Sequence, residues 1–380
     1  MFPTEPVPEK IGTYQVVKYV GHNGSADVYI ARAEGPFGFT RNVNLKMVRC
    51  ALEDDARFAE ELAREAAICA RLNHPSVVRM FDFFEYERRL VLVLEQVDGS
   101  GLDRLLAHLG RRKQRLGDGA IFYLGGQIAA ALAHAHASTD EDGNLSPVIH
   151  RDIKPDNVAI SWDGQARLAG FGLGKILGRT PDSVAGTIKG TPGYMSPEQT
   201  RGERATVRSD VYGFGVLLWS LLGNKEPPTD GARPQPLGEL RPDLPRELVA
   251  AIDAAMEPSP DRRRITCAEL AQWLAKLVKP DAGREELRQK VLWLRSTRGP
   301  QTQSRTDLPK VSQPARRRQA IQAMRTTSRR MSSFPAPPSS RRPGPATGRP
   351  LSELSRTMEM QVPAMPSERP PRSGSPTVRP

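Results

Sequence analysis

Two polar residues in one short stretch could together support the transfer of a phosphoryl group. Asp152 is followed five residues later by Asn157, and the run between them carries further charge. Phosphoryl transfer needs positioned charges and an acceptor for the proton of the attacking hydroxyl, and little covalent help from the protein. Asp152 is therefore a candidate proton acceptor, and Asn157 is a candidate metal ligand.

The sequence on either side of this stretch predicts the elements that must position it. Up to position 97, β-rich runs at 14–20, 28–33, 42–48 and 90–97 accompany one helical run at 57–72. From position 102 onward helical spacing dominates, at 102–109, 120–137, 209–222, 247–256 and 268–277. We therefore expect a small β-rich lobe followed by a larger helical lobe. A cleft between two such lobes is a natural ligand site.

The polar stretch also belongs to a longer series of motifs. Residues 150–157 read His-Arg-Asp-Ile-Lys-Pro-Asp-Asn and match the H-R-D-x-x-x-x-N pattern of protein kinases. Residues 43–46 resemble the V-A-I-K strand, and residues 190–198 resemble the segment ending in A-P-E, with Ser196 in place of Ala. From about 11 to 277 the chain resembles eukaryotic-like Ser/Thr protein kinases of the bacterial type. The resemblance implies an α+β, two-lobed protein kinase-like fold over 11–278.

The resemblance implies a catalytic role for three residues of this stretch. Asp152 would accept the proton of a protein Ser or Thr hydroxyl, and Asn157 would hold Mg²⁺. Lys154 is the feature that points to Ser/Thr rather than Tyr substrates in this family. Asp210 would brace the catalytic loop, and Arg263 would pair with the glutamate of the A-P-E-like segment.

The resemblance also implies an ATP site. Lys46 would contact the α- and β-phosphates, and Glu65 on the following helix would hold that lysine in place. The family's nucleotide-binding positions correspond here to Gly21, Gly24, Val28, Lys46, Glu65, Glu95 and Val97.

Two departures from the family pattern concern the phosphates and the metal. The glycine-rich loop has Asn23 and Ala26 where glycines are expected, although ATP would still fit, more weakly. The metal-binding Asp-Phe-Gly segment reads Gly170-Phe171-Gly172, which removes the carboxylate that would hold Mg²⁺. Asp163 is the nearest acidic residue before this segment, and we expect it on a strand turn, out of reach.

Three functions are compatible with these residues. The first is a Ser/Thr kinase homologue with impaired or no turnover, which binds nucleotide or a protein partner as a switch. The second is an active Ser/Thr kinase with reduced metal dependence, since Lys46, Glu65, Asp152 and Asn157 are all present. The third is a non-catalytic scaffold whose basic tail binds acidic partners or nucleic acid.

The charge of the chain is concentrated at its C-terminal end. The 380 residues carry 55 Lys+Arg and 43 Asp+Glu, a net charge of +12, of which residues 299–380 contribute +11 with 15 Lys+Arg and 4 Asp+Glu. This proline-rich segment cannot bury enough apolar surface to offset its backbone entropy, so we expect a disordered tail. Such a tail would bind polyanions non-specifically. It lacks the aromatic residues on which bases stack.

The remaining features of the sequence point to no particular chemistry. We expect an N-terminal extension at 1–10, an extra helix or linker at 279–298 and no membrane span, because the most apolar run, 211–222, is too short. Three widely spaced cysteines, Cys50, Cys69 and Cys267, indicate reduced thiols rather than a disulfide framework. Together with the lack of an apolar leader, they favour a cytoplasmic protein.

Overall fold

The computed structural model describes residues 7–23, 26–48, 64, 66–171 and 193–297. The chain divides into two compact units, residues 1–302 and 303–380, and everything described belongs to the first. The tail expected from position 299 lies outside the described residues, as do Gly24, Glu65 and Cys50.

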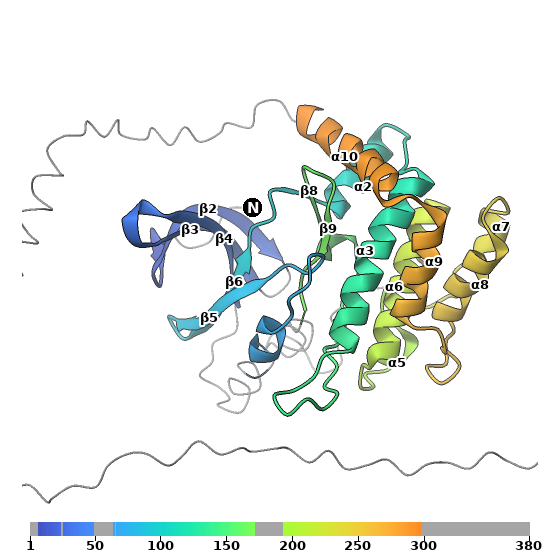
Figure 1. Ribbon diagram of the computed structural model, residues 1–380, viewed down its shortest axis with the longest axis horizontal. Coiled ribbons are helices and arrows are strands. Elements are labelled where there is room, and N and C mark those ends of the chain that lie inside the picture. Colours follow the sequence, from blue (N-terminus) through green and yellow to red (C-terminus); the bar gives the residue numbers. More distant parts are fainter. Residues whose placement is uncertain (1–6, 24–25, 49–63, 65, 172–192, 298–380) are drawn as a thin grey trace, which may run out of the picture. The chain divides into compact units, whose positions relative to one another are not determined.

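The N-terminal lobe is built on one antiparallel sheet with the strand order β1-β2-β3-β4-β6-β5 (Figure 1). Its strands are β1 (Lys10–Ile11), β2 (Tyr14–Asn23), β3 (Ala26–Glu34), β4 (Thr40–Val48), β5 (Met80–Tyr86) and β6 (Arg89–Glu95). In β4, Val43, Leu45 and Met47 are buried in the sheet core. Because side chains alternate between the faces of a strand, Lys46 projects from the opposite face of the sheet.

A second, small sheet with the order β7-β8-β9 joins the two lobes. It consists of β7 (Gly99–Gly101), β8 (Val158–Ser161) and β9 (Ala166–Leu168). The amide of Leu168 donates to the carbonyl of Ser76 at 2.8 Å, and the amide of Val78 donates to the carbonyl of Leu168 at 2.9 Å. These bonds attach β9, which leads directly to Gly170, to the segment that precedes β5.

The C-terminal lobe is a group of helices around one continuous apolar core. Its longer helices are α2 (Leu102–Arg111), α3 (Asp118–His136), α6 (Val207–Gly223), α8 (Arg246–Ala255), α9 (Cys267–Leu277) and α10 (Pro280–Thr297). Helix α6 begins with a capping box between Thr206 and Ser209 and is buried over almost its whole surface. None of the described helices has both the length and the apolar character needed to cross a membrane.

Helix α10 lies in the segment 279–298, for which an extra helix or a linker was expected, and runs from Pro280 to Thr297. It packs on α3 and α2 (Figure 1) and buries Leu287, Val291 and Leu294. The Glu286 carboxylate accepts a hydrogen bond from the amide of Ala120 at 3.0 Å, which satisfies a donor in the first turn of α3. This segment is therefore a packed part of the helical lobe.

Several elements differ from the sequence-based expectations. The strand expected over 90–97 ends at Glu95, and β1, β5 and β7 were not predicted. Strands β8 and β9, whose bounds were not predicted, flank the strand turn expected at Asp163. Of the helix expected over 57–72, Arg64 and residues 66–72 are described; Arg64 and 66–70 are helical, and the helix ends at Ala70. Cys69 and Cys267 are buried free thiols, as the sequence indicated.

Candidate active site

Asp152, Lys154 and Asn157 lie together around one carboxylate. The Asn157 amide Nδ2 donates to the backbone carbonyl of Asp152 at 2.6 Å and to its Oδ2 at 2.9 Å. Lys154 Nζ lies 2.9 Å from the same Oδ2. Asn157 is held there by the short 3₁₀ turn Pro155–Asn157, which begins β8. Asn157 Nδ2 and Lys154 Nζ both contact Oδ2 of Asp152, so Oδ1 is the carboxylate oxygen that is available to a hydroxyl.

Asp210 fixes the backbone of the loop that contains Asp152. Its two carboxylate oxygens accept hydrogen bonds from the amides of His150 and Arg151, each at 2.8 Å. His136 Nε2, from the end of α3, is 2.9 Å from Asp210 Oδ2. Arg151 has a φ of 72°, which costs a non-glycine residue free energy. The buried carboxylate therefore offsets the cost of a strained backbone that orients Asp152.

His150 links the catalytic loop to the segment that contains Gly170. Its Nδ1 accepts a hydrogen bond from the amide of Asp152 at 3.2 Å, so Nε2 carries the proton and donates to the carbonyl of Ala169 at 2.9 Å. The Phe171 ring meets the imidazole edge-on, with centroids 4.6 Å apart. Burial lowers the pKa of His150, which keeps the ring neutral and this tautomer in place.

Lys46 brings a positive charge from the sheet to the catalytic loop. It pairs in register with Val28 on β3 and with Leu92 on β6, so a ligand at Lys46 also meets Val28. Burial lowers the pKa of Lys46 to about 8, and the negative charge of Asp152 offsets only part of this effect. The nearby positive charge of Lys154 lowers the pKa further.

Gly170 stands next to the candidate metal ligand Asn157. A Cβ atom at position 170 would lie 3.4 Å from both Cγ and Oδ1 of Asn157, so a side chain there would point at the amide. Asp163 is no substitute, because it lies between β8 and β9 and pairs with Arg284 at 2.5 Å. Among the residues that the structure describes, no three Asp, Glu, His or Cys side chains gather in a group that could hold a metal. The donors that the described residues place beside Asn157 therefore lack the carboxylate at position 170 and do not fit a Mg²⁺ site.

The other nucleotide-binding candidates lie along the lobe junction. Gly21 has a φ of 138° in β2, a conformation that favours glycine, and the space around it is open. Glu95 is the last residue of β6, and its carboxylate pairs with Arg167 of β9. Val97 follows in the link to β7. Gly24 and Glu65 lie outside the described residues, so the structure brings together Gly21, Val28, Lys46 and the catalytic loop without them.

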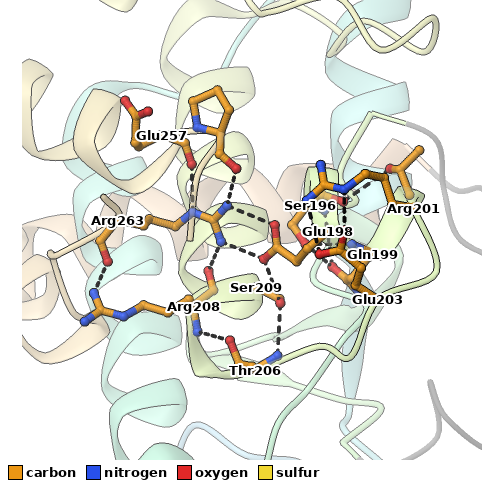
Figure 2. Close-up of polar contacts among 12 residues, drawn as sticks. Ser196, Glu198, Gln199, Arg201, Glu203, Thr206, Arg208, Ser209, Glu257 and Arg263 are labelled. Carbon is orange, nitrogen blue, oxygen red and sulfur yellow. Dashed lines mark hydrogen bonds and ion pairs between the residues drawn. The ribbon is translucent and has the colours of Figure 1, made fainter. Parts of the chain in front are cut away.

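A buried ion pair stabilises the segment that follows residue 193. Arg263 donates to both carboxylate oxygens of Glu198, at 2.8 and 3.1 Å, and Ser209 donates to the same carboxylate at 2.8 Å (Figure 2). The remaining guanidinium hydrogens reach the carbonyls of Glu257, Arg208 and Pro258. Burial alone raises the pKa of Glu198, but the hydrogen bonds outweigh it and bring the pKa to about 2.

This ion pair is connected to the catalytic loop through helix α5 (Pro197–Thr200). Ser196 and Gln199 form a capping box at its start, and Gln199 Nε2 donates to the carbonyl of Arg151 at 2.8 Å. The pairing of Glu198 with Arg263 was expected from the resemblance. The role of Gln199 was missed, although a Ser-Pro-Glu-Gln run is a capping-box signal that could have located the helix start.

The two lobes meet beside the carboxylate of Asp152, the amide of Asn157 and two lysines, Lys46 and Lys154. A family model described as "Protein kinase domain" matches residues 14–279. The chain belongs to the protein kinase family and is of the bacterial, eukaryotic-like Ser/Thr type.

Individual relatives agree with the assignment to the protein kinase family. The chain is 33% identical over 290 residues to the serine/threonine-protein kinase PknB of Mycolicibacterium smegmatis, covering 71% of this chain and 44% of that one. It is 31% identical over 280 residues to the tyrosine-protein kinase MasK of Myxococcus xanthus, covering 71% and 43%. It therefore spans less than half the length of these relatives. The crystal structure of the Mycobacterium tuberculosis PknI kinase domain is similar, with 27% identity, a TM-score of 0.55, and coverage of 70% and 97%.

Proposed function

We propose that residues 11–278 form a kinase domain that binds ATP and transfers its γ-phosphoryl group to protein Ser or Thr poorly or not at all. The observation that carries this proposal is Gly170, which places no carboxylate beside Asn157 in an otherwise complete loop. A bound metal normally neutralises the transferring group and contributes several kcal/mol. Each 1.36 kcal/mol corresponds to a factor of ten in rate, so losing the metal site costs orders of magnitude.

The remaining residues support binding of a nucleotide. Lys46 supplies a positive charge for the α- and β-phosphates, and Val28, next to it in register, supplies an apolar contact. Asp152 presents Oδ1 to a hydroxyl while Lys154 and Asn157 hold its other oxygen. ATP, when bound, supplies the phosphoryl group. The residues named here position the phosphoryl group and accept the proton of the hydroxyl. Because all of them are present, an active kinase with reduced metal dependence is the second candidate.

ATP binding with and without metal tests this proposal. We expect the full chain to bind ATP by calorimetry in EDTA with a Kd within about threefold of that in Mg²⁺, because Gly170 removes the carboxylate that would hold the metal. ATP binding by Lys46→Gln should be weaker by tenfold or more, because the variant loses at least one charge-assisted hydrogen bond to the phosphates. Failure to bind ATP in either buffer, or binding that requires Mg²⁺, would contradict the proposal.

The affinity for ATP should also depend on pH. The folded pKa of Lys46 is about 8, below its ordinary value of 10.5, so the side chain is charged at pH 7 and loses its proton as the pH rises through 8. We therefore expect ATP affinity to fall between pH 7 and 9.5 in the unmodified chain. Lys46→Gln should remove most of this dependence, and a fall of equal size in that variant would assign the titration to another group.

A further inference from the structure

A cavity of about 310 Å³ lies between helices α2 and α10 and shares no residue with the candidate active site. It is lined by Arg104, Ala107, His108, Arg111, Leu294 and Thr297. Figure 1 shows the two helices side by side at one end of the helical lobe. Its volume is at the lower end of the range for ligand pockets, about 300–1,000 Å³. The cavity therefore suits a short side-chain motif better than a large cofactor.

The shape of the cavity follows from the spacing of residues on α2. Positions 104, 107, 108 and 111 are three, four and seven residues apart, so they share one face of the helix. Ala107 is small and leaves room in front of Leu294 of α10. Beside it, the buried His108 ring meets Trp293 edge-on, with centroids 4.6 Å apart, and its Nε2 lies 3.0 Å from Thr297 Oγ1. These contacts make one wall of the cavity rigid.

The charges at the cavity are all of one sign. None of its lining residues is acidic, and Arg104 and Arg111 are exposed side chains. No ion pair found in the described part of the chain involves either of them, whereas Arg115, four residues beyond Arg111, pairs with Asp118 at 3.0 Å. The cavity thus has two guanidinium groups, no acidic lining residue, and an apolar floor formed by Ala107 and Leu294. An anion attached to an apolar group is complementary to such a site.

We propose that this cavity binds a phosphorylated Ser or Thr in a protein segment. Arg104 and Arg111 hold the phosphoryl oxygens, and a neighbouring apolar side chain of the same segment rests on Ala107 and Leu294. Arginine clusters recognise phosphorylated residues because the planar guanidinium donates two parallel hydrogen bonds to the oxygens. The site goes beyond the nucleotide site and does not depend on whether the chain transfers phosphoryl groups.

Fluorescence anisotropy of a labelled peptide tests the proposal on the full chain. The probe is a nine-residue peptide with one phosphoserine two positions from a leucine, compared with the same peptide carrying serine or glutamate instead. We expect the double variant Arg104→Gln, Arg111→Gln to weaken phosphopeptide binding by tenfold or more, because it removes the charge-assisted hydrogen bonds of both guanidinium groups. The glutamate and serine peptides should bind at least tenfold more weakly than the phosphopeptide.

Two controls separate the cavity from the overall charge of the chain. Arg246→Gln with Arg264→Gln removes the same two charges from exposed positions outside the cavity and should change binding by less than twofold. Ala107→Phe keeps every charge and fills the apolar floor, so it should weaken binding by tenfold or more. Equal losses in the two double variants, unchanged binding by Ala107→Phe, or equal binding of the three peptides would each overturn the proposal.

Discussion

Gly170→Asp is expected to raise Mg²⁺-dependent phosphoryl transfer by about 100-fold or more. The new side chain would start 3.4 Å from Asn157 Oδ1, so that an acidic and an amide oxygen face the same point. A metal held by such a pair lowers the activation free energy of transfer by several kcal/mol. A 100-fold increase in rate requires only about 2.7 kcal/mol. The measurement is the initial rate of transfer from labelled ATP to one acceptor protein in Mg²⁺, compared with the unmodified chain.

A matched variant separates the charge from the shape. Position 170 has a φ of 97°, and any side chain there is strained, at a cost on the order of 1–3 kcal/mol of stability. Gly170→Asn carries the same strain and nearly the same shape without the negative charge, and we expect a change of less than tenfold. Adding Asp152→Asn to Gly170→Asp should abolish the gain. Equal rates for Gly170→Asp and the unmodified chain would show that a missing carboxylate is not what limits transfer.

The second large effect concerns stability. Arg263→Met is expected to lower the free energy of unfolding by about 3–5 kcal/mol, because it leaves the Glu198 carboxylate buried without its bidentate partner. Urea unfolding followed by circular dichroism measures the change. Arg201→Met is the control, since Arg201 and Glu203 form an exposed pair in the same region (Figure 2) and should contribute far less to stability. Losses of unfolding free energy of similar size in Arg263→Met and Arg201→Met would contradict the claim that burial makes the Glu198–Arg263 pair important for stability.

The same pair gives a pH dependence of defined sign. The pKa of Glu198 falls from an ordinary 4.5 in the unfolded chain to about 2 in the folded protein. Its contribution to stability is therefore complete above pH 4.5 and is lost as the pH falls through 2. The stability difference between the unmodified chain and Glu198→Gln should shrink steadily over that interval, and a difference that grew would contradict the assignment.

The sequence predicted the elements with strong periodicity and missed those without it. The apolar runs that became α3 and α6 and the alternating run that became β4 were recognisable from local spacing. Strand β5 was missed because its residues, Met-Phe-Asp-Phe-Phe-Glu-Tyr, show no clear alternation, and the structure leaves most of them partly exposed. Strands β7 and β9 have three residues each, too few for any period to appear.

The site was predictable as far as motifs extend along the chain. Asp152, Lys154 and Asn157 are neighbours in sequence, and their contacts follow from one short loop. The bond from Gln199 to the carbonyl of Arg151 joins residues 48 positions apart, and no local pattern indicates it. The cavity between α2 and α10 likewise depends on how two distant helices pack, which spacing along either helix does not determine.

The most direct test of the account is the rate at which the unmodified full chain transfers phosphoryl from ATP in Mg²⁺. Kinases commonly turn over at about 1–100 s⁻¹. With Gly170→Asp as the positive control on the same acceptor, we expect the unmodified chain to fall at least about 100-fold below the variant and to show the same rate in EDTA. Turnover in the ordinary range that requires Mg²⁺ and is abolished by Asp152→Asn would contradict the claim that Gly170 leaves this kinase domain without a working metal site.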